Sequence, residues 1–219
     1  MHQMFHGLNI RDAVVLDIGS GRGLTSLWLA LQGARYVVSM EPELGGSRSG
    51  VLHLQRKRIA DLELEQIEIV TSDFEQYLPQ QLFDLIVSNA SINHLDESER
   101  DARRDSDTFE SFVEIAKQIR SWLRPGGTAV ITDACRYSFW TQAMRFGLPR
   151  RLCYSRLRTI EWRLHQQPAV WKQIFFAAGF SRCSIDYPVP FRLKKFAPII
   201  NSAPASWLLQ GEFIMRATH

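Results

Sequence analysis

Residues 14–23, VVLDIGSGRG, combine an apolar run, an aspartate and three glycines at every second position. The apolar run predicts a buried strand, and the glycines predict a turn in which bare backbone lies against a ligand. The helical pattern that follows, residues 24–31, would turn its free N–H groups and the positive end of its dipole toward the same ligand. This strand, turn and helix therefore predict a cofactor site.

The same alternation of strand and helix continues along the chain. Apolar, β-branched runs predict parallel strands at residues 13–18, 36–40, 67–71, 83–88 and 128–132. A helix is expected from about residue 107 to 123, with Asp107 and Glu110 at capping-box spacing. A helix over 168–178 and two last strands at 183–189 and 212–217 follow. This order predicts an α/β, doubly wound sheet with right-handed crossovers.

The spacing of the glycines separates two classes of cofactor. A dinucleotide fingerprint, GxGxxG, would need glycine where Leu24 stands, so the pyrophosphate interpretation fails in detail. The observed DxGxGxG pattern, with Glu41 after the second strand and Asp73 after the third, resembles class I methyltransferases that depend on S-adenosylmethionine. The resemblance extends over nearly the whole chain, through Ser88-Asn89, the LRPGG segment and the two closing strands.

The resemblance implies a Rossmann-like, seven-stranded sheet of order 3-2-1-4-5-7-6 with strand 7 antiparallel, within one domain over residues 1–219. It also implies S-adenosyl-L-methionine as cofactor and S-adenosyl-L-homocysteine as product. Glu41 would accept the ribose hydroxyls, Asp73 and Phe74 would contact adenine, and Asp17 would order the turn and reach the methionine ammonium. The cofactor-binding residues expected on this basis are Asp17, Gly19, Ser20, Gly21, Gly23, Glu41, Pro42, Asp73, Phe74, Asn89 and Ala90.

The residues after strand four bear on the class of acceptor. Methyltransferases of nucleobase exocyclic amines carry an Asn- or Asp-Pro-Pro-aromatic motif there, whereas this chain has Asn89-Ala-Ser-Ile92. That region holds no cysteine nucleophile of the cytosine carbon-5 type, and Ser88-Asn89 does not match the metal-binding catechol type. We therefore expect metal-independent transfer to a small organic molecule, to oxygen in preference to nitrogen or carbon. The alternatives are an RNA or protein methyltransferase and a non-catalytic cofactor-binding subunit.

Two histidines are candidates for a general base. His94 lies in a His-Leu-Asp sequence just beyond strand four, at the expected carboxyl edge of the sheet. His165 shares a helical face with Glu161 and Trp162 and is the second candidate. Packing or capping is the alternative role of His94.

Residues 133–167 are too long for an ordinary loop and rich in arginine and aromatic residues, so we expect a helical insertion that covers the acceptor. Arginine forks favour an acidic acceptor, with aromatic rings against its apolar part. A solvated amphipathic helix and a surface for an anionic membrane or an RNA backbone are the other interpretations. The candidate acceptor residues are Arg136, Tyr137, Trp140 and Trp162.

The composition suits a cytoplasmic globular protein. Of its 219 residues 22% are charged and 45% hydrophobic, the net charge of +3 is too small to imply nucleic acid by itself, and the start of the chain lacks the apolar core of a signal peptide. No run approaches the roughly 18 apolar residues that a membrane helix needs.

The apolar residues between 191 and 209 fit either internal packing, which we favour, or contact with a second subunit.

Overall fold

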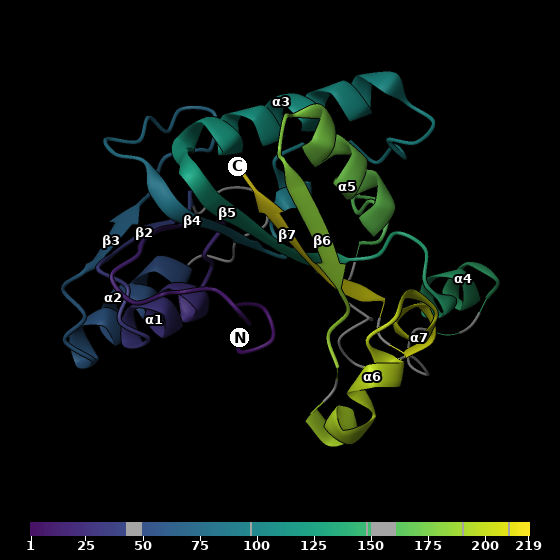
Figure 1. Cartoon of the computed structure of the whole chain (residues 1–219), viewed down its shortest axis with the longest axis horizontal. Coiled ribbons are helices and arrows are strands. Elements are labelled where there is room, and N and C mark those ends of the chain that lie inside the picture. The colour runs from purple at the N-terminus through teal and green to yellow at the C-terminus, as the bar shows by residue number, and fades with distance from the viewer. Residues whose placement is uncertain (43–49, 97, 148, 150–160, 190, 210) are drawn as a thin grey trace.

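The computed structural model of the protein describes residues 1–219 except 43–49, 97, 148, 150–160, 190 and 210 (Figure 1). Its strands are β1 (Val14–Ile18), β2 (Tyr36–Met40), β3 (Ile67–Val70), β4 (Phe83–Asn89), β5 (Leu123–Ala134), β6 (Arg182–Asp186) and β7 (Glu212–Thr218). Its helices are α1 (Leu24–Leu31), α2 (Val51–Asp61), α3 (Ser106–Trp122), α4 (Phe139–Arg145), α5 (Pro168–Ala177), α6 (Ala197–Ile200) and α7 (Ala203–Leu209), with 3-10 turns η1 (Ile92–His94) and η4 (Phe191–Phe196).

The seven strands form one mixed sheet in the order β3-β2-β1-β4-β5-β7-β6. Strands β1 to β5 pair in parallel, and β7 runs antiparallel between β5 and β6. The predicted fold class and strand order are therefore confirmed. Because β7 runs the opposite way, its first residue, Glu212, lies at the edge where β4 and β5 end.

Apolar cores lie on both faces of the sheet, as buried parallel strands require. One core packs α3 and α5 against the sheet through residues such as Phe112, Trp171 and Phe175, all fully buried. The other packs α1 and the N-terminal segment through residues such as Leu29 and Met4. Figure 1 shows the two groups of helices on opposite sides of the strands.

Several element boundaries differ from the expected ones; strand six, expected over 183–189, covers Arg182–Asp186, and most other strand ends differ by one residue. Helix α3 begins one residue earlier, because Asp105 is its N-cap and accepts a hydrogen bond from the Thr108 backbone N–H at 3.1 Å. The predicted capping box from Asp107 to Glu110 does not form the cap. Strand β5 begins at Leu123 instead of residue 128, since Leu123 already pairs with Phe83 across an irregularity in the ladder.

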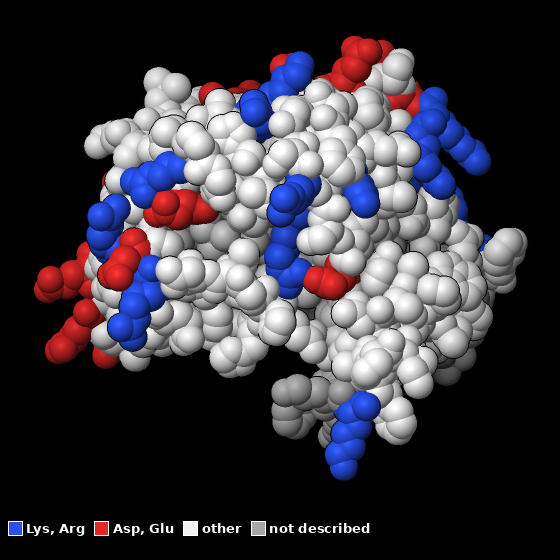
Figure 2. Space-filling view, in the orientation of Figure 1, with Lys and Arg blue, Asp and Glu red and all other residues white. Residues whose placement is uncertain are grey.

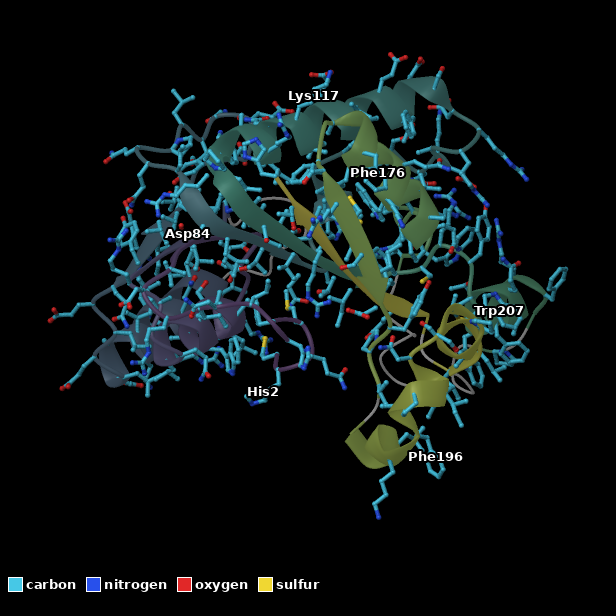
Figure 3. All side chains as sticks on the ribbon, in the orientation of Figure 1. His2, Asp84, Lys117, Phe176, Phe196 and Trp207 are labelled. Atoms are coloured by element: carbon cyan, nitrogen blue, oxygen red, sulfur yellow. The ribbon has the colours of Figure 1, made fainter. Side chains whose placement is uncertain are left out.

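The expected insertion after strand five begins with two more residues of β5 and contains α4, while residues 150–160 lie outside the described residues. Helix α7 packs beside α4, and the centres of the Phe139 and Trp207 rings are 5.7 Å apart. Figure 3 shows Trp207 between these helices and Phe196 at the outer end of the same group. Internal packing of this segment is thus partial, since Ile199 remains 74% exposed.

Candidate functional site

The glycine turn after β1 packs closely against the rest of the protein at Gly19 and faces open space at Gly21. Gly19, Gly21 and Gly23 all have positive φ, from 54° to 71°, which favours glycine. A Cβ on Gly19 would lie 2.4 Å from the Ser91 Cβ, whereas a Cβ on Gly21 would meet nothing within 4 Å. The turn is therefore fixed against the loop after β4 and has free space at Gly21.

Helix α1 starts directly after this turn without a side-chain cap. Gly23 is its N-cap residue, in the left-handed conformation, and therefore offers no side chain as a cap. Uncapped N–H groups at a helix start are suited to a polar ligand.

Asp17 lies beneath the turn and is 1% exposed. Its Oδ2 accepts a hydrogen bond from the Ser26 hydroxyl at 2.6 Å, while its Oδ1 has no hydrogen-bond partner among the described residues. Burial raises the pKa of Asp17 to about 7, and the nearby Glu41 carboxylate acts in the same direction. A cationic ligand group would stabilise the ionised form of this carboxyl.

Glu41 follows β2 and is 5% exposed. Its Oε2 accepts a hydrogen bond from the Gly21 backbone N–H at 2.6 Å, which places the carboxylate beside the open side of the turn. Pro42, next in the chain, is half-buried. Ser20 donates its backbone N–H to the Met40 carbonyl at 2.9 Å, so the turn is joined to the end of β2.

The other predicted cofactor residues follow β3 and β4. Phe74 is buried with its ring 4.9 Å from Trp122, and the half-buried Asp73 caps a turn with its backbone carbonyl. Ala90 has φ 58° and donates its N–H to the Thr132 carbonyl at 2.7 Å. The predicted cofactor residues thus lie near the end of β1, in the glycine turn, at the end of β4, and in the loops that follow β2, β3 and β4.

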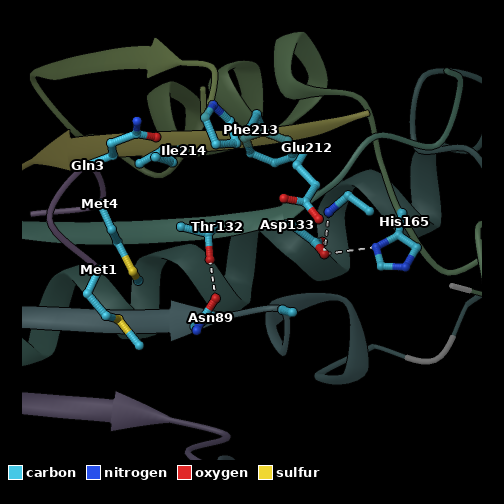
Figure 4. Close-up of a pocket in the computed structure, with 13 residues that line it drawn as sticks. Met1, Gln3, Met4, Asn89, Thr132, Asp133, His165, Glu212, Phe213 and Ile214 are labelled. Carbon is cyan, nitrogen blue, oxygen red and sulfur yellow. Dashed lines mark hydrogen bonds and ion pairs between the residues drawn. The ribbon is translucent and has the colours of Figure 1, made fainter. Parts of the chain in front are cut away.

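A cavity of about 420 Å³ opens beside Asn89 and Ala90 (Figure 4). It lies where β4 and β5 end and β7 begins, and the N-terminal segment covers part of it. The lining residues are Met1, Gln3, Met4, Asn89, Ala90, Thr132, Asp133, Ala134, His165, Pro188, Glu212, Phe213 and Ile214.

One histidine and one carboxylate in this lining are hydrogen-bonded. His165 Nδ1 lies 2.9 Å from Asp133 Oδ1, and both side chains are almost fully buried. Since a carboxylate only accepts, the histidine donates from Nδ1, and its Nε2 is then free to accept a proton. The Asp133 Oδ1 also accepts the Ala134 backbone N–H at 2.8 Å.

The two base candidates have different surroundings. His165 lines the cavity, whereas His94 ends the 3-10 turn η1 with an exposed side chain and is not part of the cavity lining.

The four candidate acceptor residues, all described, lie outside the cavity lining. Arg136 is buried and donates its guanidinium to backbone carbonyls, including those of Glu99 at 2.7 Å and His165 at 3.2 Å. Tyr137 donates its hydroxyl to Asp101 at 2.9 Å. The Cζ atom of Arg145 lies 4.1 Å from the centre of the Trp162 ring. The rings of Trp140 and Phe139 are in edge-to-face contact, with their centres 5.3 Å apart.

Sequence reasoning did not assign Asp133, Glu212 or the N-terminal residues Met1 and Met4 to the site. The position of Asp133 at the end of strand five was the available signal for it. Glu212 and the N-terminal methionines join the site only through the strand order and the chain path, which the local sequence does not reveal.

On the face shown in Figure 2, Lys and Arg side chains occupy several separate places and are mixed with Asp and Glu. Within the described ranges there is no group of three His, Cys, Asp or Glu side chains that could hold a metal ion. No described helix has the length and hydrophobicity needed to span a membrane.

Comparison with known proteins gives the family. The family model described as "Methyltransferase domain" matches residues 2–168. A release factor glutamine methyltransferase of Shewanella oneidensis is 30% identical over 129 residues, 53% of this chain and 43% of that protein. A tRNA1(Val) (adenine(37)-N6)-methyltransferase of Bacteroides fragilis is 29% identical over 127 residues, 55% of this chain and 52% of that protein. The chain thus matches about half the length of these relatives.

Among solved structures, a putative S-adenosylmethionine dependent methyltransferase from Listeria monocytogenes superposes with a TM-score of 0.62. The superposition covers 99% of this chain and 96% of that chain at 15% identity, so it shows a shared fold.

Proposed function

The chain belongs to the methyltransferase-domain family and is an S-adenosylmethionine-dependent methyltransferase, and on this premise we propose that it methylates a hydroxyl of a small organic molecule bound in the cavity beside Asn89. The cavity, adjacent to the predicted cofactor residues and lined by the hydrogen-bonded His165, is the observation that carries this proposal. Its volume of about 420 Å³ is in the range of small-molecule sites.

The chain's own residues fit the cofactor on three sides. The unpartnered Oδ1 of Asp17 is available to an ammonium group, directly or through water. The open side of Gly21, next to the Glu41 carboxylate, has room for a sugar whose hydroxyls would donate to that carboxylate. Asp73 and Phe74 follow the next strand, where they would contact the adenine ring.

The cofactor would supply a methyl group on a sulfonium, and the protein would align the acceptor oxygen with it. His165 would accept the hydroxyl proton at Nε2 as the oxygen attacks. Asp133 would hold the ring in the tautomer that leaves Nε2 unprotonated and would stabilise the imidazolium that forms.

A second candidate is an RNA or protein acceptor, which the names of the two curated relatives favour. The sequence Asn89-Ala-Ser-Ile92 speaks against the exocyclic-amine class, because it lacks the Pro-Pro-aromatic motif expected of nucleobase enzymes. Among the described residues, the Lys and Arg side chains on the face shown in Figure 2 lie in separate places and do not form one continuous basic surface.

The test is methyl transfer from labelled S-adenosylmethionine to a panel of phenols, alcohols and amines, with transfer RNA and total protein as parallel acceptors. We expect a methyl ether, identified by mass spectrometry, with at least one hydroxyl compound. Incorporation of label into RNA or protein alone would contradict the small-molecule assignment. Asp17→Ala is the control, because loss of the cofactor contact should abolish transfer to every acceptor.

A further inference from the structure

We propose that Gln55, a residue of α2, is a positioning residue of the cofactor site and acts on Asp17 through a chain of two buried hydroxyl groups. The chain keeps the Asp17 carboxylate oriented and ionised for the ammonium group of the cofactor. This inference rests on the proposed contact between Asp17 and the cofactor, and it adds a residue from outside the glycine turn.

Four polar side chains form this chain, one from each of β1, α1, β2 and α2. They are Asp17, Ser26, Ser39 and Gln55, of which Asp17 is 1% exposed and the other three are 0% exposed. Because water does not reach these groups, their hydrogen bonds have to be made within the protein.

The contacts run without interruption from α2 to β1. Gln55 Nε2 donates a hydrogen bond to Ser39 Oγ. Ser39 Oγ lies 2.8 Å from Ser26 Oγ, and Ser26 Oγ lies 2.6 Å from Asp17 Oδ2. Three successive hydrogen bonds therefore join the Gln55 amide to the Asp17 carboxylate.

The direction of these bonds follows from the number of hydrogens. The ionised Asp17 carboxylate only accepts, so it takes the single hydroxyl hydrogen of Ser26. Ser26 must then accept from the Ser39 hydroxyl, which leaves Ser39 to accept from the Gln55 amide. All three donors thus point toward Asp17.

Such a chain favours negative charge at its end. Hydrogen bonds in series polarise one another, and a bond to a carboxylate is stronger than one between neutral groups. Burial raises the pKa of Asp17 to about 7, hydrogen bonds from Ser26 oppose this rise, and the negative charge of Glu41 adds to it. The chain therefore counteracts the neutralisation of Asp17 by its buried position.

Gln55 also packs against the glycine turn. A Cβ on Gly23, the N-cap residue of α1, would lie 2.6 Å from Gln55 Cγ and 2.7 Å from its Nε2. The Gln55 side chain thus fills the space beside the start of α1, and the amide is held between the turn and Ser39.

The remaining amide oxygen has a cost that an apolar side chain would avoid. Gln55 Oε1 is buried and has no hydrogen-bond partner among the residues that the structure describes. An unpaired buried oxygen lowers stability. A position that keeps such a group is expected to serve a site more than the stability of the core.

The experiment measures the affinity of the full chain for S-adenosyl-L-homocysteine by calorimetry at pH 7 and pH 8.5. Gln55→Met removes the donor and keeps the length of the side chain, and Ser39→Ala interrupts the chain in the middle. At pH 7 each variant should bind about 3-fold to 10-fold more weakly than the parent protein, the effect of one buried hydrogen bond.

The pH dependence separates this role from a loss of packing. Without the chain the pKa of Asp17 rises further, so less of the carboxylate is ionised at pH 7. At pH 8.5 the carboxylate is mostly ionised again, and the loss should shrink to less than about 2-fold. Each variant is compared with the parent protein at the same pH, so that the titration of the ligand cancels.

The double variant tests whether the two residues act as one chain. Gln55→Met should have almost no further effect on affinity once Ser39→Ala is present, because Gln55 reaches Asp17 through Ser39. Fold-losses that multiply in the double variant would overturn the proposal.

Gln166→Met is the matched control. Gln166 is also fully buried, and its amide bonds to the Ala102 N–H and the Arg100 carbonyl. This variant should leave the affinity for S-adenosyl-L-homocysteine unchanged even where the free energy of unfolding falls.

The chain and the cofactor contact fail in different ways. If Asp17→Asn weakens binding but Gln55→Met and Ser39→Ala do not, or if their losses are equal at both pH values, the chain is wrong and the contact of Asp17 stands. If Asp17→Asn leaves the affinity unchanged, the contact is wrong and the chain with it. No acceptor takes part in these measurements, so the result is independent of the molecule that is methylated.

Discussion

His165 Nδ1 and Asp133 Oδ1 lie 2.9 Å apart on the wall of the cavity, although the two residues are separated by the whole segment after β5. A carboxylate that accepts from one ring nitrogen leaves the other nitrogen available as a base. The proposed chemistry therefore depends on Asp133.

Replacing His165 should affect turnover and spare the cofactor. His165→Ala is expected to lower kcat by about 100-fold to 10,000-fold, the usual contribution of a general base. Affinity for S-adenosyl-L-homocysteine should stay near that of the parent protein. His94→Ala is the matched comparison, since that side chain is exposed and outside the cavity lining, and its turnover should remain within a few-fold. A larger loss of kcat in His94→Ala than in His165→Ala would indicate that His94 is the base.

Asp133 is a positioning residue in this account, and its loss should lower the rate while the affinity for S-adenosyl-L-homocysteine stays the same. In Asp133→Asn the side chain no longer fixes the His165 ring as a carboxylate does, so Nε2 is less well oriented to accept the proton. We expect kcat itself to drop by about 10-fold or more. A kcat equal to that of the parent protein would show that the hydrogen bond has no part in the reaction.

Cofactor affinity should depend on the protonation of Asp17. Burial raises the pKa of Asp17 from 3.8 to about 7, whereas an ammonium ligand favours the ionised carboxylate. Binding of S-adenosyl-L-homocysteine should therefore weaken below pH 7, by up to roughly tenfold per pH unit. Calorimetry across this range measures the effect. Asp17→Asn should bind weakly at every pH, and a pH dependence that survives this substitution would have another origin.

The same shift predicts how the ligand-free protein responds to pH. Because the folded-state pKa of Asp17 lies above the unfolded value of 3.8, the folded state binds more protons between these two values. The contribution of this group to stability is therefore full below about pH 4 and is lost as pH rises through 7. Denaturant titrations should show a smaller loss over this window in Asp17→Asn than in the parent protein.

Two glycines of the turn should respond differently to alanine. Both have positive φ, which costs an added Cβ about 1–2 kcal/mol. At Gly19 the Cβ would also approach the Ser91 Cβ to 2.4 Å, whereas at Gly21 it meets nothing within 4 Å. Gly19→Ala should thus reduce the free energy of unfolding more than Gly21→Ala, and Gly21→Ala should mainly weaken cofactor binding. Equal loss of stability would mean that the contact with Ser91 relaxes freely.

The local pattern of the sequence predicted the strands and the glycine turn, whereas the order of the strands in the sheet was implied by the resemblance to class I methyltransferases and is confirmed. Glu41 and Asp73 follow β2 and β3, as expected. The sequence ranked His94 above His165, since a motif gives the place of a residue and not the direction of its side chain. In the structure η1 leaves His94 exposed. The approach of Asp133 to His165, and of Glu212 to the same edge, requires contacts between distant parts of the chain.

The most direct test is a crystal structure of the protein with S-adenosyl-L-homocysteine. We predict that the ribose contacts Glu41 and that the sulfur opens onto the cavity lined by Asp133 and His165. A sulfur separated from that cavity, or a ribose bound away from Glu41, would contradict the account.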